Sequence, residues 1–294
     1  MSVTIFDPSL VADLLTREFV QQSLAALFLL GLLGGVLGPI VVSRQMAFAV
    51  HGTAELSFTG AAAALLAGFS VNVGGILGSI VAAVVFGLLG YRAKERDSVI
   101  GVVMAFGLGL GILFVSLYGQ VRTAFALLAG QVVAVGSQGL ITVAVTTVVV
   151  LAVMAIIWRP LLFASTDPVV AESLGLPTRT LSVVFAVLLG AAVAQCVQVI
   201  GALLVMSLVI TPAAAAVRLT ASPARVVVLA TVFAEISALG GFVLSLSPNV
   251  PSSAVITSIS FAIYVVCRVV GARRRRASGR AVVATSPGKT VAPT

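Results

Sequence analysis

Charge is almost absent from long stretches of this sequence, and this feature constrains the fold more than any other. Only 9% of the 294 residues are Asp, Glu, Lys or Arg, whereas 60% are apolar. A soluble domain is typically about a quarter charged, because hydrated groups must cover its surface. This chain cannot cover itself in that way, so most of its surroundings must be lipid.

The apolar runs have the length of membrane spans. A helix needs about 20 apolar residues to cross a bilayer, and backbone polar groups in lipid must be satisfied within the segment. The sequence therefore predicts an all-α, polytopic membrane protein with eight or nine transmembrane helices. Eight would apply if one of the short runs, 54–70 or 181–196, were merged or re-entrant. The nine predicted spans lie near residues 20–42, 54–70, 75–90, 98–117, 138–157, 181–196, 200–217, 226–246 and 254–270.

Basic residues indicate the orientation and the domain organisation. Seven of the 17 Lys and Arg lie in the last 27 residues, where there is no Asp or Glu. The positive-inside rule makes this end cytoplasmic, and counting back through nine spans puts the N-terminus outside. We expect an N-terminal segment at 1–18, a transmembrane domain at 19–271 and a basic tail at 272–294. The tail is expected to be disordered, or alternatively to contact anionic lipid headgroups.

The composition excludes several other classes of protein. The basic residues follow membrane spans, so they do not indicate nucleic-acid binding. Cys196 and Cys267 lie in apolar runs and imply no disulfide framework. The first residues lack the basic region of a cleaved signal peptide. We expect a multi-pass protein of the plasma membrane.

Ionisable residues in or beside apolar runs are expensive and by default indicate function. His51 is the only histidine of the chain, and Glu55 follows it by four residues, so both share one face of a helix. An imidazole and a carboxylate form a partial site for zinc or manganese, and further ligands would come from a neighbouring span or a second subunit. The alternative is a hydrogen-bonded pair that fixes helix packing.

Two further ionisable residues, Arg44 and Glu235, lie beside or within spans. For Glu235 an ion pair with Arg44 or Arg218 is favoured. A third metal ligand and a proton carrier are the alternatives.

Two connecting segments differ from plain spans. Residues 118–137 contain several polar residues and suggest a short helix at the outer face. In the loop 158–180, Asp167 and Pro168 begin, and Gly175 and Pro177 end, a short run that contains Glu172. This is the pattern of a short capped helix. It is either an ordinary loop helix or a docking site for a cytoplasmic partner.

Glycine motifs give no nucleotide-binding site. Gly107-Leu-Gly109-Leu-Gly111 lies in an apolar span and is better explained by close helix packing. Gly288-Lys289-Thr290 resembles the end of a phosphate-binding loop, but Val283 stands where the first glycine is needed. We expect no enzyme activity and no resident cofactor. Transport would require an ion gradient or a separate ATPase.

Five segments, in order, resemble the permease subunits of ATP-binding-cassette importers for zinc, manganese and iron. The first matches the family segment that carries a metal-path aspartate and histidine. Here His51 is at the position of that aspartate, Glu55 at that of the histidine and Thr59 at that of a proline. The imidazole and the carboxylate have thus changed places, and the segment still contains one of each. The segments are Arg44–Gly60, Arg96–Gly111, Leu128–Ala134, Asp167–Pro177 and Val199–Ala216.

The resemblance implies a fold, a mechanism and partners. It implies a homodimer around a metal path, with each copy seated on a separate cytoplasmic ATPase and an external metal-binding protein delivering the ion. Asp167, Pro168, Glu172 and Gly175 would belong to the loop that couples to the ATPase. Two copies would supply two histidines and two glutamates, which is a sufficient tetrahedral shell. Zinc is favoured as the transported substrate, with manganese and iron as alternatives.

Two other function classes remain as rivals. A proton- or sodium-coupled carrier of a small metabolite would use Glu55 and Glu235, but the sequence shows no clear internal repeat. An intramembrane metalloprotease would need a fuller motif such as His-Glu-x-x-His, which a single histidine cannot supply.

Overall fold

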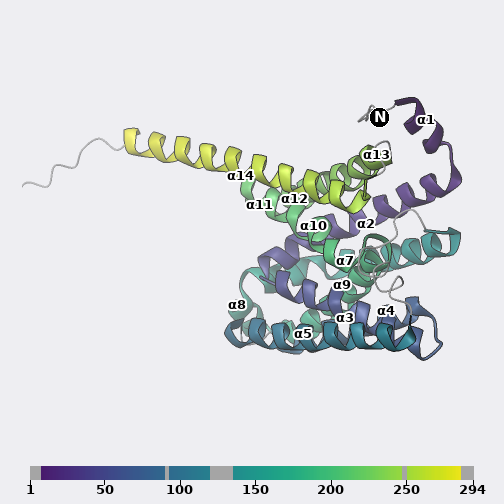
Figure 1. The fold of residues 1–294 in the computed structure, drawn as a ribbon. Coiled ribbons are helices and arrows are strands. Elements are labelled where there is room, and N and C mark those ends of the chain that lie inside the picture. Colours follow the sequence, from purple (N-terminus) through teal and green to yellow (C-terminus); the bar gives the residue numbers. More distant parts are fainter. Residues whose placement is uncertain (1–7, 90–92, 120–134, 247–249, 286–294) are drawn as a thin grey trace, which may run out of the picture.

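The computed structural model describes residues 8–89, 93–119, 135–246 and 250–285. Helices make up nearly all of these residues, and they contain no strand (Figure 1), which confirms the predicted all-α class. The helices are α1 (Pro8–Leu15), α2 (Glu18–Ser43), α3 (Ala47–Leu66), α4 (Val71–Leu89), α5 (Ala93–Tyr118), α7 (Ser137–Thr166), α8 (Pro168–Ser173), α9 (Thr178–Ile200), η2 (Ala202–Leu204), α10 (Val205–Val209), α11 (Thr211–Leu219), α12 (Pro223–Glu235), the π-helix η3 (Ile236–Gly240), α13 (Gly241–Leu246) and α14 (Ser252–Thr285).

Each predicted span coincides with helix, but in the described part of the chain only seven helical stretches are long and apolar enough to cross a membrane by themselves. Helix α3 is 20 residues long but does not reach the apolarity of the seven, and it carries His51 and Glu55. The predicted span 200–217 is not one helix. It is broken into η2, α10 and α11, because Gly201 adopts a φ of +89° and Pro212 cannot donate a backbone hydrogen bond.

Two helices extend beyond the predicted spans. Helix α7 continues to Thr166, so the loop expected at 158–180 is confined to the segment around α8. Helix α14 continues to Thr285, so residues 272–285 of the expected disordered tail are helical. Arginine and alanine favour helix and Pro287 lies only beyond Thr285, which accounts for the extension. Most of the segment expected as an outer-face helix, 118–137, lies outside the described residues.

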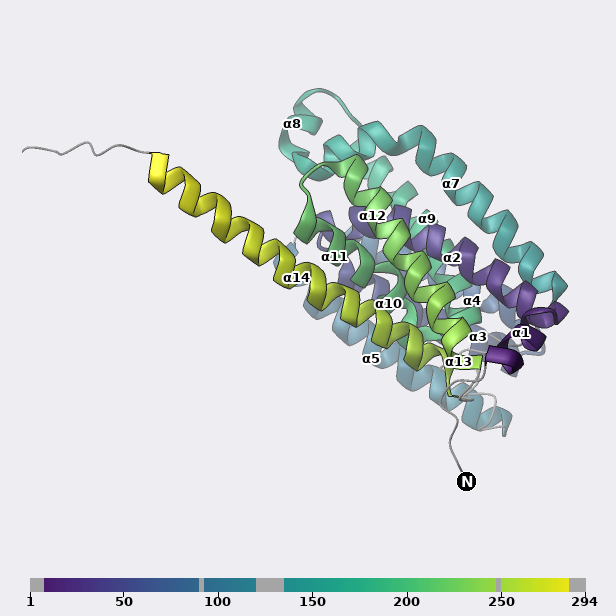
Figure 2. The ribbon, with the colours of Figure 1, turned by 90° about the horizontal axis from the view of Figure 1, so that it is seen from above.

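The interior of the bundle is built on α2 and α9. In an apolar stretch of 18 residues, 67% of α2 and 72% of α9 are buried, against 22–39% for the other candidate spans. In Figures 1 and 2, α3, α4 and α5 lie on one side of α2, and α12 and α14 lie on the other. Helix α3 packs on α4 and α5, α4 packs on α9, and α2 packs on α12 and α7. The bundle thus has two groups of helices joined through α2 and α9.

The chain reverses repeatedly between the two ends of this bundle. The end that carries α8, here called the α8 end, also holds the α2–α3 turn, the α11–α12 turn and the last turns of α14 (Figures 1 and 2). Helix α1 and α13 lie at the opposite end. The residues of the site are distributed between the α8 end and the first turns of α3.

Candidate functional site

The predicted pair lies together on α3, one turn apart. His51 Nε2 is 3.8 Å from Glu55 Oε1, and the His51 side chain is 28% exposed whereas that of Glu55 is 5% exposed. The separation is too long for a hydrogen bond. The imidazole is partly exposed, and the carboxylate one turn further along α3 is almost fully buried.

The remaining polar atoms of the pair have no partner in the described part of the chain. His51 Nδ1 and Glu55 Oε2 are both buried and both lack a hydrogen bond there. A pair that served only to fix helix packing would be expected to satisfy its buried polar atoms, because an unmade buried hydrogen bond costs about 1–3 kcal/mol. These atoms have free capacity for a ligand.

One copy of the chain does not complete a metal site from the residues described. Among them, no third His, Cys, Asp or Glu lies close enough to form a cluster with His51 and Glu55. The two side chains alone leave a divalent metal short of ligands.

Glu235 lies elsewhere, and the ion pair expected for it is not formed. Its carboxylate is at the end of α12 against Gly31 of α2, and neither of its oxygens has a partner among the described residues. Arg44 lies at the α8 end, whereas Glu235 is in the middle of the α12–α13 span, so the two charges cannot meet. Nor does Glu235 join His51 and Glu55 within one chain. A role as proton carrier stays a prediction.

Hydroxyl groups that follow Glu55 in the chain bond α3 to its neighbouring helices. Ser57 Oγ donates to the carbonyl oxygen of Gly75 in α4 at 3.0 Å, and Thr59 Oγ1 donates to that of Gly107 in α5 at 2.7 Å. The threonine at the position of the family proline thus makes a contact between helices that proline could not make. The helix that carries His51 and Glu55 is one unit with α4 and α5.

The predicted capped helix forms as α8. Asp167 Oδ1 accepts a hydrogen bond from Val170 N at 3.0 Å, and Pro168 occupies the first turn. Gly175 has a φ of +77°, and the Leu176 amide bonds back to Ala171, which is the glycine-terminated end expected from the sequence. Thr178 Oγ1 also donates to Glu172 Oε1 at 2.9 Å. All four predicted residues, Asp167, Pro168, Glu172 and Gly175, are exposed, so their predicted contact with an ATPase stays a prediction.

The α8 segment also exposes large apolar side chains at positions that were not predicted as site residues. Val169 is 77% exposed and Leu174 is 69% exposed, whereas Ala171 is fully buried. Exposed apolar side chains on a six-residue helix outside the spans are typical of a docking surface. The exposure of Val169 and Leu174 could have been predicted from the sequence, because apolar residues in a short polar loop have no core to fill.

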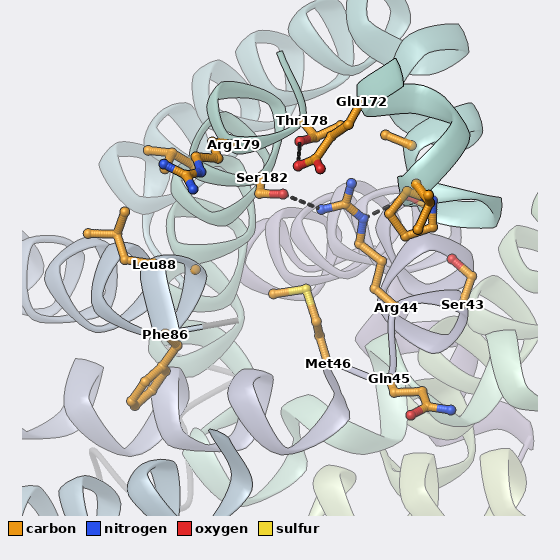
Figure 3. Close-up of a pocket in the computed structure, with 16 residues that line it drawn as sticks. Ser43, Arg44, Gln45, Met46, Phe86, Leu88, Glu172, Thr178, Arg179 and Ser182 are labelled. Carbon is orange, nitrogen blue, oxygen red and sulfur yellow. Dashed lines mark hydrogen bonds between the residues drawn. The ribbon is translucent and has the colours of Figure 1, made fainter. Parts of the chain in front are cut away.

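A pocket of about 780 Å³ lies behind α8 (Figure 3). It is bounded by the α2–α3 turn, the end of α4 and the α7–α9 segment, and its polar lining includes Arg44, Ser165, Glu172, Arg179 and Ser182. Arg44 points into the junction between the ends of α7 and α9 (Figure 3). The pocket separates α8 from the helix that carries His51 and Glu55.

Arg44 is held by neutral groups. Its Nε donates to Ser165 Oγ at 2.7 Å, its Nη1 donates to Ser182 Oγ at 3.1 Å, and its guanidinium lies 5.6 Å from the centre of the Phe185 ring. Burial lowers the pKa of Arg44 from its usual value, but an arginine remains charged at neutral pH. The serines had no distinguishing signal in the sequence.

The sequence is similar to those of known membrane transport proteins. The model of the ABC 3 transport family matches residues 16–271. The manganese transport system membrane protein MntC of Listeria monocytogenes is 28% identical over 252 residues, covering 85% of this chain and 90% of that protein. The chelated iron transport system membrane protein YfeC of Yersinia pestis is 27% identical over 206 residues, or 70% of each chain.

A solved structure has the same fold. The structure described as PsaBC from Streptococcus pneumoniae in complex with Fab superposes with a TM-score of 0.80 at 22% identity, covering 88% of this chain and 94% of that chain. At this identity the likeness concerns the fold alone.

Proposed function

The chain belongs to the ABC 3 transport family, and from that premise we propose that it forms the transmembrane path of an ATP-driven importer of a divalent transition metal. The membership confirms the resemblance seen in the sequence. It makes the chain a transport subunit rather than an enzyme.

The observation that carries the metal assignment is the His51–Glu55 pair. Two side chains of metal-ligand type approach to 3.8 Å from adjacent turns of α3, and each keeps one buried polar atom without a partner among the described residues. Nitrogen and carboxylate oxygen are ligands that manganese, iron and zinc all accept. The exchange of ligand types relative to the family segment keeps one imidazole and one carboxylate in each copy.

Manganese is our first candidate for the transported ion. The relatives are named for manganese and for chelated iron, whereas the imidazole and carboxylate pair by itself led us to expect zinc. Because a carboxylate is a hard ligand and no thiolate accompanies the pair, the donor set suits manganese at least as well as zinc. Competition between the two ions distinguishes these alternatives.

A homodimer would complete the metal site. Two copies related by a two-fold axis supply two imidazoles and two carboxylates, which is enough for a four-coordinate ion. The lack of a third ligand among the described residues of one copy supports this proposal. The partial exposure of His51 also supports it, because the described residues of one copy do not fully enclose the imidazole.

The α8 end would face the cytoplasm and bind a separate ATPase. Basic residues at this end, such as Arg44, Arg179, Arg218, Arg225 and Arg273, support a cytoplasmic location. The exposed Val169 and Leu174 would enter the ATPase, and ATP would act only through that subunit. An extracytoplasmic metal-binding protein would deliver the ion at the opposite end, in the plasma membrane.

Transport in proteoliposomes tests the proposal. The chain is reconstituted with its ATPase and metal-binding protein, and uptake of manganese, zinc and iron is measured by mass spectrometry with and without ATP. His51→Ala and Glu55→Ala are each expected to lower uptake by at least about tenfold, because each removes a ligand from every copy. The double variant His51→Asp/Glu55→His retains both ligand types and is expected to retain uptake.

Three results would contradict the proposal. Uptake that survives both alanine variants would return the pair to helix packing. Uptake without the ATPase that collapses when a proton gradient is dissipated would indicate the secondary carrier instead. ATP-dependent uptake of a metabolite without any metal would show a permease of this fold with another substrate.

A further inference from the structure

We propose that Arg44 is the positioning residue that links the α8 loop to the metal-ligand helix α3. The inference rests on the proposed function and adds to it a route by which movement of α8 reaches His51 and Glu55. Nothing in the ligand pair or in the α8 loop by itself requires this route. It follows from where one side chain is anchored.

Arg44 spans both sides of the α8 loop. Ser165, which accepts from its Nε, lies two residues before Asp167 at the end of α7. Ser182, which accepts from its Nη1, lies in the first turns of α9. One guanidinium therefore bonds to the helix that enters the loop and to the helix that leaves it, as Figure 3 shows.

The backbone of Arg44 is tied to α3 by a short and well-bonded turn. Arg44 ends α2, and only Gln45 and Met46 separate it from the first residue of α3. The Met46 amide bonds back to Val41, and the Val50 amide bonds to the Met46 carbonyl, so the turn is held at both ends. His51 is the residue after Val50, in the second turn of α3. A displacement of Arg44 must therefore move the start of α3 and His51 with it.

A displacement of the start of α3 would also move the neighbouring helices α4 and α5. Ser57 and Thr59 bond this helix to α4 and α5, so its first turns move with a larger unit. The pocket of about 780 Å³ gives the α8 loop room to shift against the α2–α3 turn and the end of α4. Motion of the loop is thus carried to the helices that hold the metal ligands.

The partners of Arg44 suit a contact that changes during a cycle. The hydrogen bonds of its guanidinium go to the hydroxyl groups of Ser165 and Ser182, which carry no charge. Breaking a buried ion pair costs about 3–5 kcal/mol, because it leaves a buried charge uncompensated. Bonds to two serine hydroxyls and contact with the Phe185 ring cost less to rearrange.

The test is the number of metal ions transported per ATP hydrolysed, measured in the proteoliposomes described above. Arg44→Gln and the double variant Ser165→Ala/Ser182→Ala are expected to lower this ratio roughly threefold or more, in the range typical of residues that carry coupling. Ser165→Thr/Ser182→Thr keeps both hydroxyls and is expected to restore it. Arg218→Gln, which removes another arginine at the α8 end, is the matched control and is expected to leave the ratio unchanged.

The outcomes separate this inference from its premise. No ATP-dependent metal uptake by the wild-type chain would overturn the proposed function. Wild-type uptake together with an unchanged ratio in Arg44→Gln and in the serine-to-alanine variant would overturn only the role of Arg44. If Arg44→Gln failed to assemble with the ATPase, the serine variants would decide, because they keep the arginine and remove only its two anchors.

Discussion

Gln45 and Gly175 occupy the same position in two helix ends of the same design. In each case the residue after the C-cap is left-handed, with a φ of +55° at Gln45 and +77° at Gly175, and the next amide bonds back five residues. Glycine is favoured there because a side chain in this conformation costs roughly 1 kcal/mol. The end of α8 could be predicted for this reason, whereas Gln45 carries no signal of a turn.

Gly175→Ala is expected to loosen the α8 loop without unfolding the bundle. The alanine must adopt a φ that costs about 1 kcal/mol, so amides of residues 167–177 should exchange hydrogen roughly fivefold faster, as measured by mass spectrometry. Gly136→Ala is the control, because Gly136 has an ordinary φ of −76° and open space around it. Equal exchange rates in the two variants would show that the φ of Gly175 does not limit this loop.

Glycines allow α2 to reach the centre of the bundle. A side chain at Gly35 would overlap the backbone of Thr231 in α12, and one at Gly34 would lie 2.7 Å from the Leu208 carbonyl oxygen in α10. Small residues at such positions let helices approach closely in lipid. Gly107 and Gly111 do the same for α5 against α3, but Gly109, which belongs to the same sequence pattern, faces open space.

Gly35→Ala and Gly109→Ala form a matched pair for this packing. The first must separate α2 from α12 and is expected to lower the free energy of unfolding by about 1–3 kcal/mol. The second adds a methyl group to open space, and alanine favours helix, so no loss is expected. Thermal unfolding of both variants in the same detergent measures the difference. A Gly35→Ala variant as stable as Gly109→Ala would mean that α2 and α12 can move apart freely.

Hydropathy located the helices well and their interruptions poorly. Helix is found at each of the nine predicted spans, because only a helix satisfies its backbone in lipid. The break at Gly201 and Pro212 was not recognised, because the run 200–217 remains apolar across it. Trp158, Arg159 and Pro160 were interpreted as the start of a loop, although α7 continues through them.

The site was partly predictable for a comparable reason. Ligand spacing on one helix depends only on local geometry, so His51 and Glu55 could be placed together from the sequence. The partners of Arg44 depend on how α7 and α9 meet, and two ordinary serines give no indication of it. The prediction of an ion pair for Glu235 was wrong, because the charge of a residue does not tell which end of a bundle it occupies.

The two ends of the chain lie at opposite ends of the bundle, and their charges indicate its orientation in the membrane. Among the described residues, the helices from α2 to α14 run between the two ends nine times if the broken α10–α11 segment is counted once, and α1 and the end of α14 lie at opposite ends (Figure 1). The acidic Asp13 and Glu18 lie near α1, whereas the arginines of α14 lie at the α8 end. We therefore expect the α8 end to be cytoplasmic.

Labelling of single cysteines at the two ends tests this orientation directly. Cys196 and Cys267 are buried, so the background reaction of the native chain with a membrane-impermeant maleimide should be low. Val169 on α8 and Phe69 on the α3–α4 connection are 77% and 75% exposed and lie at opposite ends of the bundle. Val169→Cys should react only in inside-out vesicles and Phe69→Cys only in intact cells stripped of their wall. Because exposure is matched, a reversed pattern would mean that α8 faces outward, where no ATPase could reach it.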